Sequence, residues 1–296
     1  MKTKRTLIIA TLMAAAIGLS LNACKKDSST TSTSATDSEG ISTSTSATAS
    51  EMMYDDAFDV VNQSGEQSGV STSSIKGSPA VDATGTDTVS YSTTAGATIT
   101  LTPTDPSVFP KTLTVNYGAG VTSANGVTRK GEIIVTLSGK IRVAGTTITV
   151  NYNNYSVNGY SLAGTYTMVP NIAANSGVNY SVTVTNGSVT FPGGSVSTYS
   201  GSETFTQVGG IGTSSITDDT YQITGGFTYS SASTGSISGV VTTPLIKSAD
   251  CKDITSGIVA LTYKGLSGTL DFGSGTCDDQ ATLTFGKTVK VITLAR

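Results

Sequence analysis

Apolar and polar residues alternate along most of the chain after residue 97. The segment 132–143, for example, places Ile133, Val135 and Leu137 on one face and Thr136 on the other. A period of two is typical of a strand that is buried on one face only. The pattern recurs over 146–155, 178–185, 221–229, 281–285 and 288–294. It predicts about a dozen antiparallel strands within residues 97–296.

Short turn signals separate these segments. Three of them are Asn-Gly pairs, at 125–126, 158–159 and 186–187. This dipeptide favours two-residue hairpin turns, in which both central residues need a positive φ. Strands joined by hairpins form a meander. The predicted fold is therefore all-β, an antiparallel meander that forms a barrel-like or a sandwich domain, with one short N-terminal helix.

A helical period replaces the alternation in the segment 51–61. Met53, Ala57 and Val60 fall on one side of a helix there, and Ser50 stands where an N-cap is expected. The pattern predicts a short helix at the start of an otherwise irregular segment, 51–96.

Residues 24–50 are small and polar almost throughout, with Ile41 as the one large apolar side chain after Cys24. Such a composition offers little apolar surface to offset the entropy cost of ordering a chain. The sequence therefore predicts that residues 24–50 form a disordered tether.

The first 23 residues resemble a bacterial secretory signal, with basic residues before an apolar run over 7–18. Residues 21–24, Leu-Asn-Ala-Cys, resemble the lipobox of bacterial lipoproteins, which implies that acyl chains are attached to Cys24. Several acyl chains hold a protein firmly on a membrane without spanning it. The following Lys25-Lys26-Asp27 looks like the export signals of Bacteroidota surface lipoproteins. The resemblance implies an outer-membrane location, with the cell surface favoured and a periplasm-facing protein as the alternative.

Two further cysteines, Cys251 and Cys277, remain when Cys24 is set aside. An even number of cysteines in an exported chain is typical of disulfide pairing. We expect these two to be joined, and two unpaired core thiols are the alternative.

Composition excludes several kinds of chemistry. The chain has no His, which removes Ser-His-Asp hydrolysis, Cys-His nucleophiles and His-ligated zinc. A net charge of −3 with only 12% charged residues does not suit a phosphate backbone. We therefore expect no nucleic-acid partner and no cofactor.

Two groups of side chains are candidate sites. Four tyrosines could stack on a sugar, although half-buried packing is the more ordinary role for such residues: Tyr152, Tyr155, Tyr160 and Tyr166. Three carboxylates beside two glycines could hold a cation, although a tight hairpin that positions Cys277 is the favoured interpretation: Asp271, Asp278 and Asp279.

The C-terminal two-thirds of the chain also resembles a family of uncharacterised Bacteroidota lipoproteins. The resemblance is carried by the segments 109–118, 128–135, 158–160, 219–225, 244–245 and 273–278 and covers residues 109–294. It implies an all-β domain and supports the pairing of Cys251 with Cys277. No activity comes with it.

Together these observations favour a lipid-anchored protein of the cell envelope that is not an enzyme. Its β domain would bind a glycan, another envelope protein or a host protein. A glycoside hydrolase that uses two carboxylates and a purely structural envelope protein are the alternatives.

Overall fold

The computed structural model describes residues 29–71, 89–92, 96–173, 177–213 and 215–296. The predicted signal segment and Cys24 lie outside the described residues.

One helix and fifteen strands make up the described chain. The helix is α1 (Ser29–Gln67). The strands are β1 (Val89–Ser92), β2 (Thr98–Thr102), β3 (Lys111–Asn116), β4 (Val121–Thr122), β5 (Thr128–Leu137), β6 (Ile148–Val157), β7 (Tyr160–Ile172), β8 (Val178–Thr190), β9 (Val196–Gly209), β10 (Thr220–Ser231), β11 (Gly235–Ser248), β12 (Ser256–Tyr263), β13 (Leu266–Ser274), β14 (Gln280–Phe285) and β15 (Thr288–Thr293).

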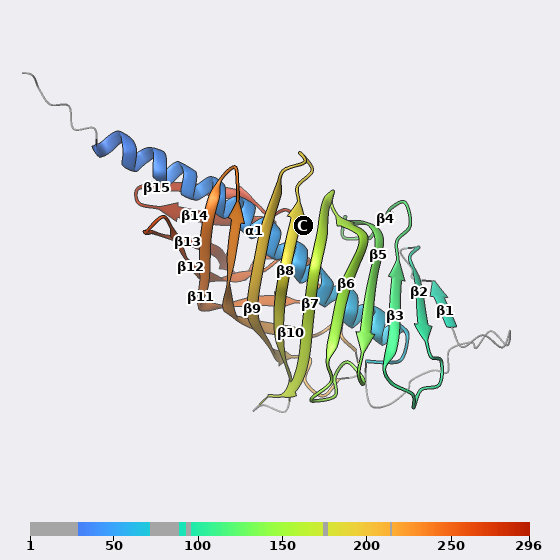
Figure 1. The fold of residues 1–296 in the computed structure, drawn as a ribbon. Coiled ribbons are helices and arrows are strands. Elements are labelled where there is room, and N and C mark those ends of the chain that lie inside the picture. The colour runs from blue at the N-terminus through green and yellow to red at the C-terminus, as the bar shows by residue number, and fades with distance from the viewer. Residues whose placement is uncertain (1–28, 72–88, 93–95, 174–176, 214) are drawn as a thin grey trace, which may run out of the picture.

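All fifteen strands belong to one antiparallel sheet, and nearly every strand pairs with its neighbours in sequence. The small strand β4 pairs only with β5, and the path otherwise runs in order from β1 to β15. The predicted antiparallel all-β meander is therefore confirmed. The sheet does not close, because the described residues of β1 and β15 form its two free ends. It curls instead around α1, which crosses its concave side (Figure 1).

The helix is much longer than predicted, with 39 residues that include most of the supposed tether. The prediction of disorder over 24–50 is wrong for residues 29–50, and the predicted helix at 51–61 is the middle of α1. Every residue from Ala47 to Phe58 is buried, so this part of the helix is enclosed on all sides. Within the described part of the chain, we find no helix whose length and apolar character would let it cross a membrane.

Hydrogen bonds within α1 offset part of the cost of burying so polar a segment, although the buried hydroxyls of Ser44 and Thr48 have no partner among the described residues. The hydroxyls of Thr45 and Ser50 donate to carbonyl oxygens four residues earlier, at 2.8 and 3.0 Å. The one hydrogen of the Thr43 hydroxyl is shared between the carbonyl oxygens of Glu39 at 2.9 Å and Thr234 at 2.7 Å. Each of these three hydroxyls therefore loses little when it leaves water. The small side chains also let the sheet approach closely, since a Cβ added at Gly40 would lie 3.1 Å from the ring of Phe285.

Aromatic rings pack the second half of α1 against the sheet. Phe58 stacks on Phe205 of β9 with 4.5 Å between ring centroids, and Tyr54 stacks on Tyr199 of the same strand at 5.1 Å. The Tyr54 hydroxyl donates to the carbonyl oxygen of Ala163 at 2.7 Å. The core thus lies between the helix and the inward face of the sheet.

The Asn-Gly pairs divide into turns and a bulge. Asn158 and Gly159 have φ values of 47° and 85° and join β6 to β7 as predicted. The pair at 125–126 lies in the turn between β4 and β5. The third pair, at 186–187, is not a hairpin turn, because it lies inside β8 where the register against β9 shifts. A positive φ is needed at such a bulge as well as at a turn.

Candidate functional site

The outward face of β9–β12 is hollowed by a shallow depression of about 350 Å³. The outward-pointing side chains that line it are all Ser or Thr, and we call it the hydroxyl groove: Thr198 and Ser200 of β9, Thr228 and Ser230 of β10, Ser236 and Ser238 of β11, and Thr262 of β12. The neighbours Tyr199, Tyr229 and Ile237 are buried on the opposite face.

Strand register arranges these hydroxyls in two rows across the groove. Ser200, Thr228, Ser238 and Thr262 are consecutive cross-strand partners and form the longer row. The shorter row has Ser230 at its centre, and the Ser230 and Ser236 hydroxyl oxygens are 2.8 Å apart. Adjacent strands lie about 4.8 Å apart, so the hydroxyls form a regular lattice.

The side chains of this lattice carry no charge. Each hydroxyl can both donate and accept hydrogen bonds. The residues that line the groove include no Asp, Glu, Lys or Arg. It is therefore suited to a neutral ligand with many hydroxyls, and unsuited to an ion.

The four candidate tyrosines do not form an exposed surface. Tyr155 and Tyr166 are buried on the inner side of the sheet, and Tyr152 is half-buried and 5.8 Å from the ring of Tyr155. Tyr160, also half-buried, packs edge-on against Phe191 at 5.3 Å. The prediction of a shared sugar platform is wrong, because alternation turns three of these rings toward α1.

A cluster of carboxyls lies in the core under α1. Glu51 of the helix and Glu203 of β9 share a hydrogen bond, with 5% and 8% of their surfaces exposed. Burial, and then the charge of Asp55, raises the pKa of Glu51 to about 8. Burial and the other two acids raise the pKa of Glu203 well above its usual value. Two carboxyls can share a hydrogen bond only if one of them keeps its proton, so at least one carboxyl of this pair is protonated in the folded protein.

The next turn of α1 has the opposite electrostatics. Asp56 accepts hydrogen bonds from Arg129 at 2.5 and 2.9 Å and from the Tyr155 hydroxyl at 2.6 Å. Burial alone would raise the pKa of Asp56, but the charges of Arg129 and Arg296 outweigh it and hold this pKa well below its usual value. Asp59 pairs with Lys247 at 3.1 Å and with Arg296. These acids are therefore ionised partners of three buried cations.

Glu132 and Glu203, a pair of acids that the hydrolase alternative could use, do not meet. Glu132 accepts hydrogen bonds from Asn116 and Asn153 on the outward side of β5, whereas Glu203 points inward from β9. Glu51 is the acid that meets Glu203, and α1 covers both. Sequence could not reveal this pair, because its members are far apart in the chain and belong to a helix and a strand.

The candidate cation site is open and unassembled. Asp271 and Asp278 are exposed and cap the backbone N–H groups of Gly273 at 2.8 Å and Gln280 at 3.0 Å, and Asp279 is exposed as well. Among the described residues, no group of three or more His, Cys, Asp or Glu side chains is arranged to hold a metal ion. The turn interpretation accounts for these residues.

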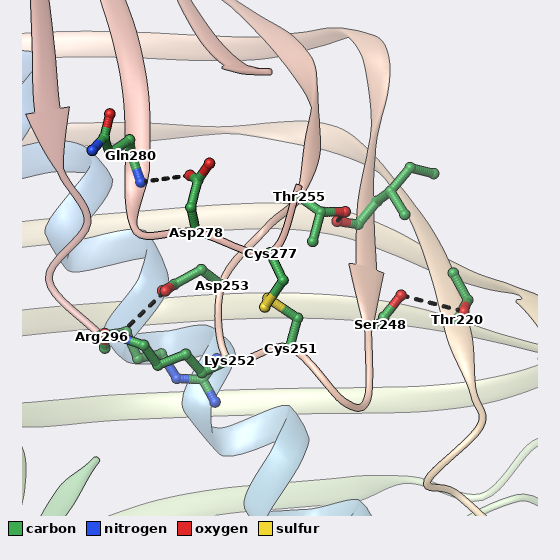
Figure 2. Close-up of a disulfide and its surroundings, with 11 residues drawn as sticks. Thr220, Ser248, Cys251, Lys252, Asp253, Thr255, Cys277, Asp278, Gln280 and Arg296 are labelled. Carbon is green, nitrogen blue, oxygen red and sulfur yellow. Dashed lines mark hydrogen bonds and ion pairs between the residues drawn. A yellow bond between two sulfur atoms is a disulfide. The ribbon is translucent and has the colours of Figure 1, made fainter. Parts of the chain in front are cut away.

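The predicted disulfide between Cys251 and Cys277 is confirmed, with 5.8 Å between the two Cα atoms. Figure 2 shows that the bond lies beside Lys252, Asp253 and Arg296, near the end of the chain. It ties the β11–β12 connection to the β13–β14 connection.

The groove residues were not singled out from the sequence. Their signal is present, because a polar position recurs at every second residue of four neighbouring strands, but it becomes a site only once the register is known. Comparison with known proteins adds no family: no family model, no curated protein and no solved structure matches this chain.

Proposed function

We propose that the protein is a non-enzymatic, lipid-anchored component of the outer membrane whose hydroxyl groove binds a neutral saccharide. The observation that carries the binding role is the groove itself, in which seven hydroxyls from four strands line one depression without a charged side chain. The lipobox-like residues 21–24 support the anchor.

The groove predicts weak, multivalent recognition. Stacking of sugars on aromatic rings supplies much of the affinity in many sugar sites, and the rings of Tyr199 and Tyr229 point away from this groove. Hydrogen bonds that replace hydrogen bonds to water give a small net gain each. Many copies on one membrane would compensate through avidity.

A catalytic alternative is less well supported. The two carboxyls that meet, those of Glu51 and Glu203, are enclosed between α1 and the sheet. A glycosidic bond could reach them only if the helix moved away.

The binding role is tested on the chain without the predicted signal segment 1–23 and with Cys24→Ala, which lacks the proposed acylation site. Binding to an array of neutral oligosaccharides is compared before and after Ser200→Ala, Thr228→Val and Ser238→Ala are combined. We expect loss of binding for this variant. The matched control places Ser181→Ala and Thr183→Val on β8, which are exposed on the same face outside the groove, and it should bind normally. No binding by any form would favour a purely structural role.

The location is tested with protease on intact cells. Digestion of the wild-type protein, with a periplasmic protein protected, would place the domain on the cell surface. Protection until the envelope is broken would place it on the periplasmic side.

A further inference from the structure

We propose that α1 is a rigid strut between the acylated Cys24 and the β domain, and that it turns one end of the domain toward the bilayer. That end is formed by the β10–β11, β12–β13 and β14–β15 turns. The inference rests on the proposed lipid anchor and adds the orientation of the protein on the membrane.

Three contacts fix this end of the sheet to the first half of α1. The hydroxyl of Thr43 donates to the carbonyl oxygen of Thr234 in the β10–β11 turn at 2.7 Å. Glu39 forms an ion pair at 2.8 Å with Lys264 of the β12–β13 turn. Gly286, in the β14–β15 turn, packs so closely on the helix that an added Cβ would lie 2.6 Å from the Asp37 carboxylate. The turns therefore surround residues 37–43 of α1.

Chain length limits how far this end can be from the membrane. Ser29, where α1 begins, follows Cys24 by five residues, and five residues span at most about 18 Å when fully extended. Thr43 follows Ser29 by fourteen residues of helix, which is about 21 Å. The far end of the helix at Gln67 is about 36 Å further along the axis. The turns are therefore the near end, and the first turns of α1 project beyond the sheet (Figure 1).

Charge is distributed in the same direction. The near turns at 231–235, 264–265 and 286–287 contain no Asp or Glu and carry exposed Lys264 and Lys287. Asp37 and Glu39 of α1 lie beside these turns, and Glu39 pairs with Lys264, so the near end is close to neutral. The connections at the opposite ends of these strands carry four exposed acids: Asp218, Asp250, Asp278 and Asp279. A bilayer with anionic lipids attracts basic groups and repels acidic ones within a Debye length. An anionic bilayer therefore repels the acidic opposite end more strongly than the near end, to which the proposed anchor leads.

The hydroxyl groove lies on the same side of the molecule. Its shorter row ends at Ser230 and Ser236, which flank the β10–β11 turn. The proposed orientation therefore places this end of the groove close to the membrane surface.

The orientation can be measured because the chain contains no Trp. Ala232→Trp places one fluorophore in the near β10–β11 turn, and Thr217→Trp places one in the exposed β9–β10 connection at the opposite ends of the strands. The acylated full-length protein is reconstituted into vesicles of phosphatidylethanolamine and phosphatidylglycerol that contain dansyl-labelled headgroups. We expect energy transfer to be several-fold greater from Ala232→Trp. Equal transfer, or more from Thr217→Trp, would overturn the orientation.

The strut is tested in the same assay with Thr33→Pro, which interrupts α1 before its contacts with the sheet, and with Thr33→Ala as the matched control. The difference between the two reporters should shrink in the proline variant and persist in the alanine variant. An unchanged difference in Thr33→Pro would show that α1 is not the strut. Acylation is measured separately by the mass of the N-terminal peptide against Cys24→Ala. An unmodified cysteine would refute the proposed anchor, whereas an acylated protein with equal transfer would refute only the orientation.

Discussion

Replacing Glu51 by Gln should make the protein more stable at neutral pH, although most changes of buried residues destabilise a fold. Glu51 and Glu203 share a hydrogen bond in the core, and the buried cations Arg129 and Arg296 face Asp56 instead. The side-chain oxygen of a glutamine of nearly the same shape can still accept a hydrogen bond from the protonated Glu203 carboxyl. The change removes only the proton uptake of Glu51 itself.

The magnitude follows from the pKa of Glu51, which is about 8 in the folded protein against an ordinary value of 4.5. Between these values the folded state binds more protons than the unfolded state, so the free energy of unfolding falls as pH rises. The contribution of Glu51 is complete below 4.5 and declines up to about 8. At pH 7 the loss corresponds to about 2.5 pH units, or about 3 kcal/mol. We expect Glu51→Gln to be more stable than the wild type by this order at pH 7, and nearly equal to it below 4.5.

The assay is urea unfolding of the Cys24→Ala chain without residues 1–23 and with its disulfide intact, in steps of about one pH unit from about pH 5 to about pH 8. The difference between Glu51→Gln and the parent should grow by about 1.4 kcal/mol per pH unit. Glu132→Gln, on the outward side of β5, is the control and should leave the pH dependence unchanged. Parallel curves for the parent and Glu51→Gln would refute the reasoning, because they would mean that Glu51 takes up no extra proton when the protein folds.

Three other changes should destabilise the fold, each measured by chemical unfolding. Replacing both Cys251 and Cys277 by Ser should cost about 3 to 4 kcal/mol, because the bond closes a loop with a sequence separation of 26, and a loss that reducing agent cannot reproduce would contradict this. Asp56→Ala should cost about 3 to 5 kcal/mol by leaving Arg129 buried and unpaired, and a smaller loss than that of an exposed acid would show that the pair does not matter. Gly131→Ala should lower stability by more than about 2 kcal/mol, because φ is 74° and the added Cβ would lie 2.2 Å from a carbonyl oxygen of β6, and an unchanged unfolding midpoint would argue against that backbone conformation.

The strands could be predicted because each hides one face, and alternation records this residue by residue. The order of the strands follows too, since hairpins leave little choice of neighbour. The Asn186-Gly187 pair shows where this reasoning fails, because a turn and a bulge need the same backbone conformation. Only the length of the flanking apolar pattern could separate the two.

The full length of α1 could not be predicted from the apolar pattern, which indicated a helix only over residues 51–61. Its first half has few apolar side chains, and hydrophobic periodicity is a signal of burial only when the buried groups are apolar. Thr43 and Ser50 are buried with their hydroxyls bonded to the helix backbone. The carboxyl pair was hidden for a related reason, since Glu51 and Glu203 meet only because α1 crosses β9.

The position of α1 links the stability of the fold to its proposed role. A separate tether would let the domain fold alone and move freely above the membrane. Here residues Ala47 to Phe58 fill the concave side of the sheet, so the segment that leads to the proposed anchor is also the core of the domain. Loss of α1 would expose the aromatic face around Phe205 and Tyr199, which the helix covers. The proposed anchoring would therefore depend on the same helix as the fold, and a change that loosens α1 should disturb the orientation of the groove before it disturbs the groove itself.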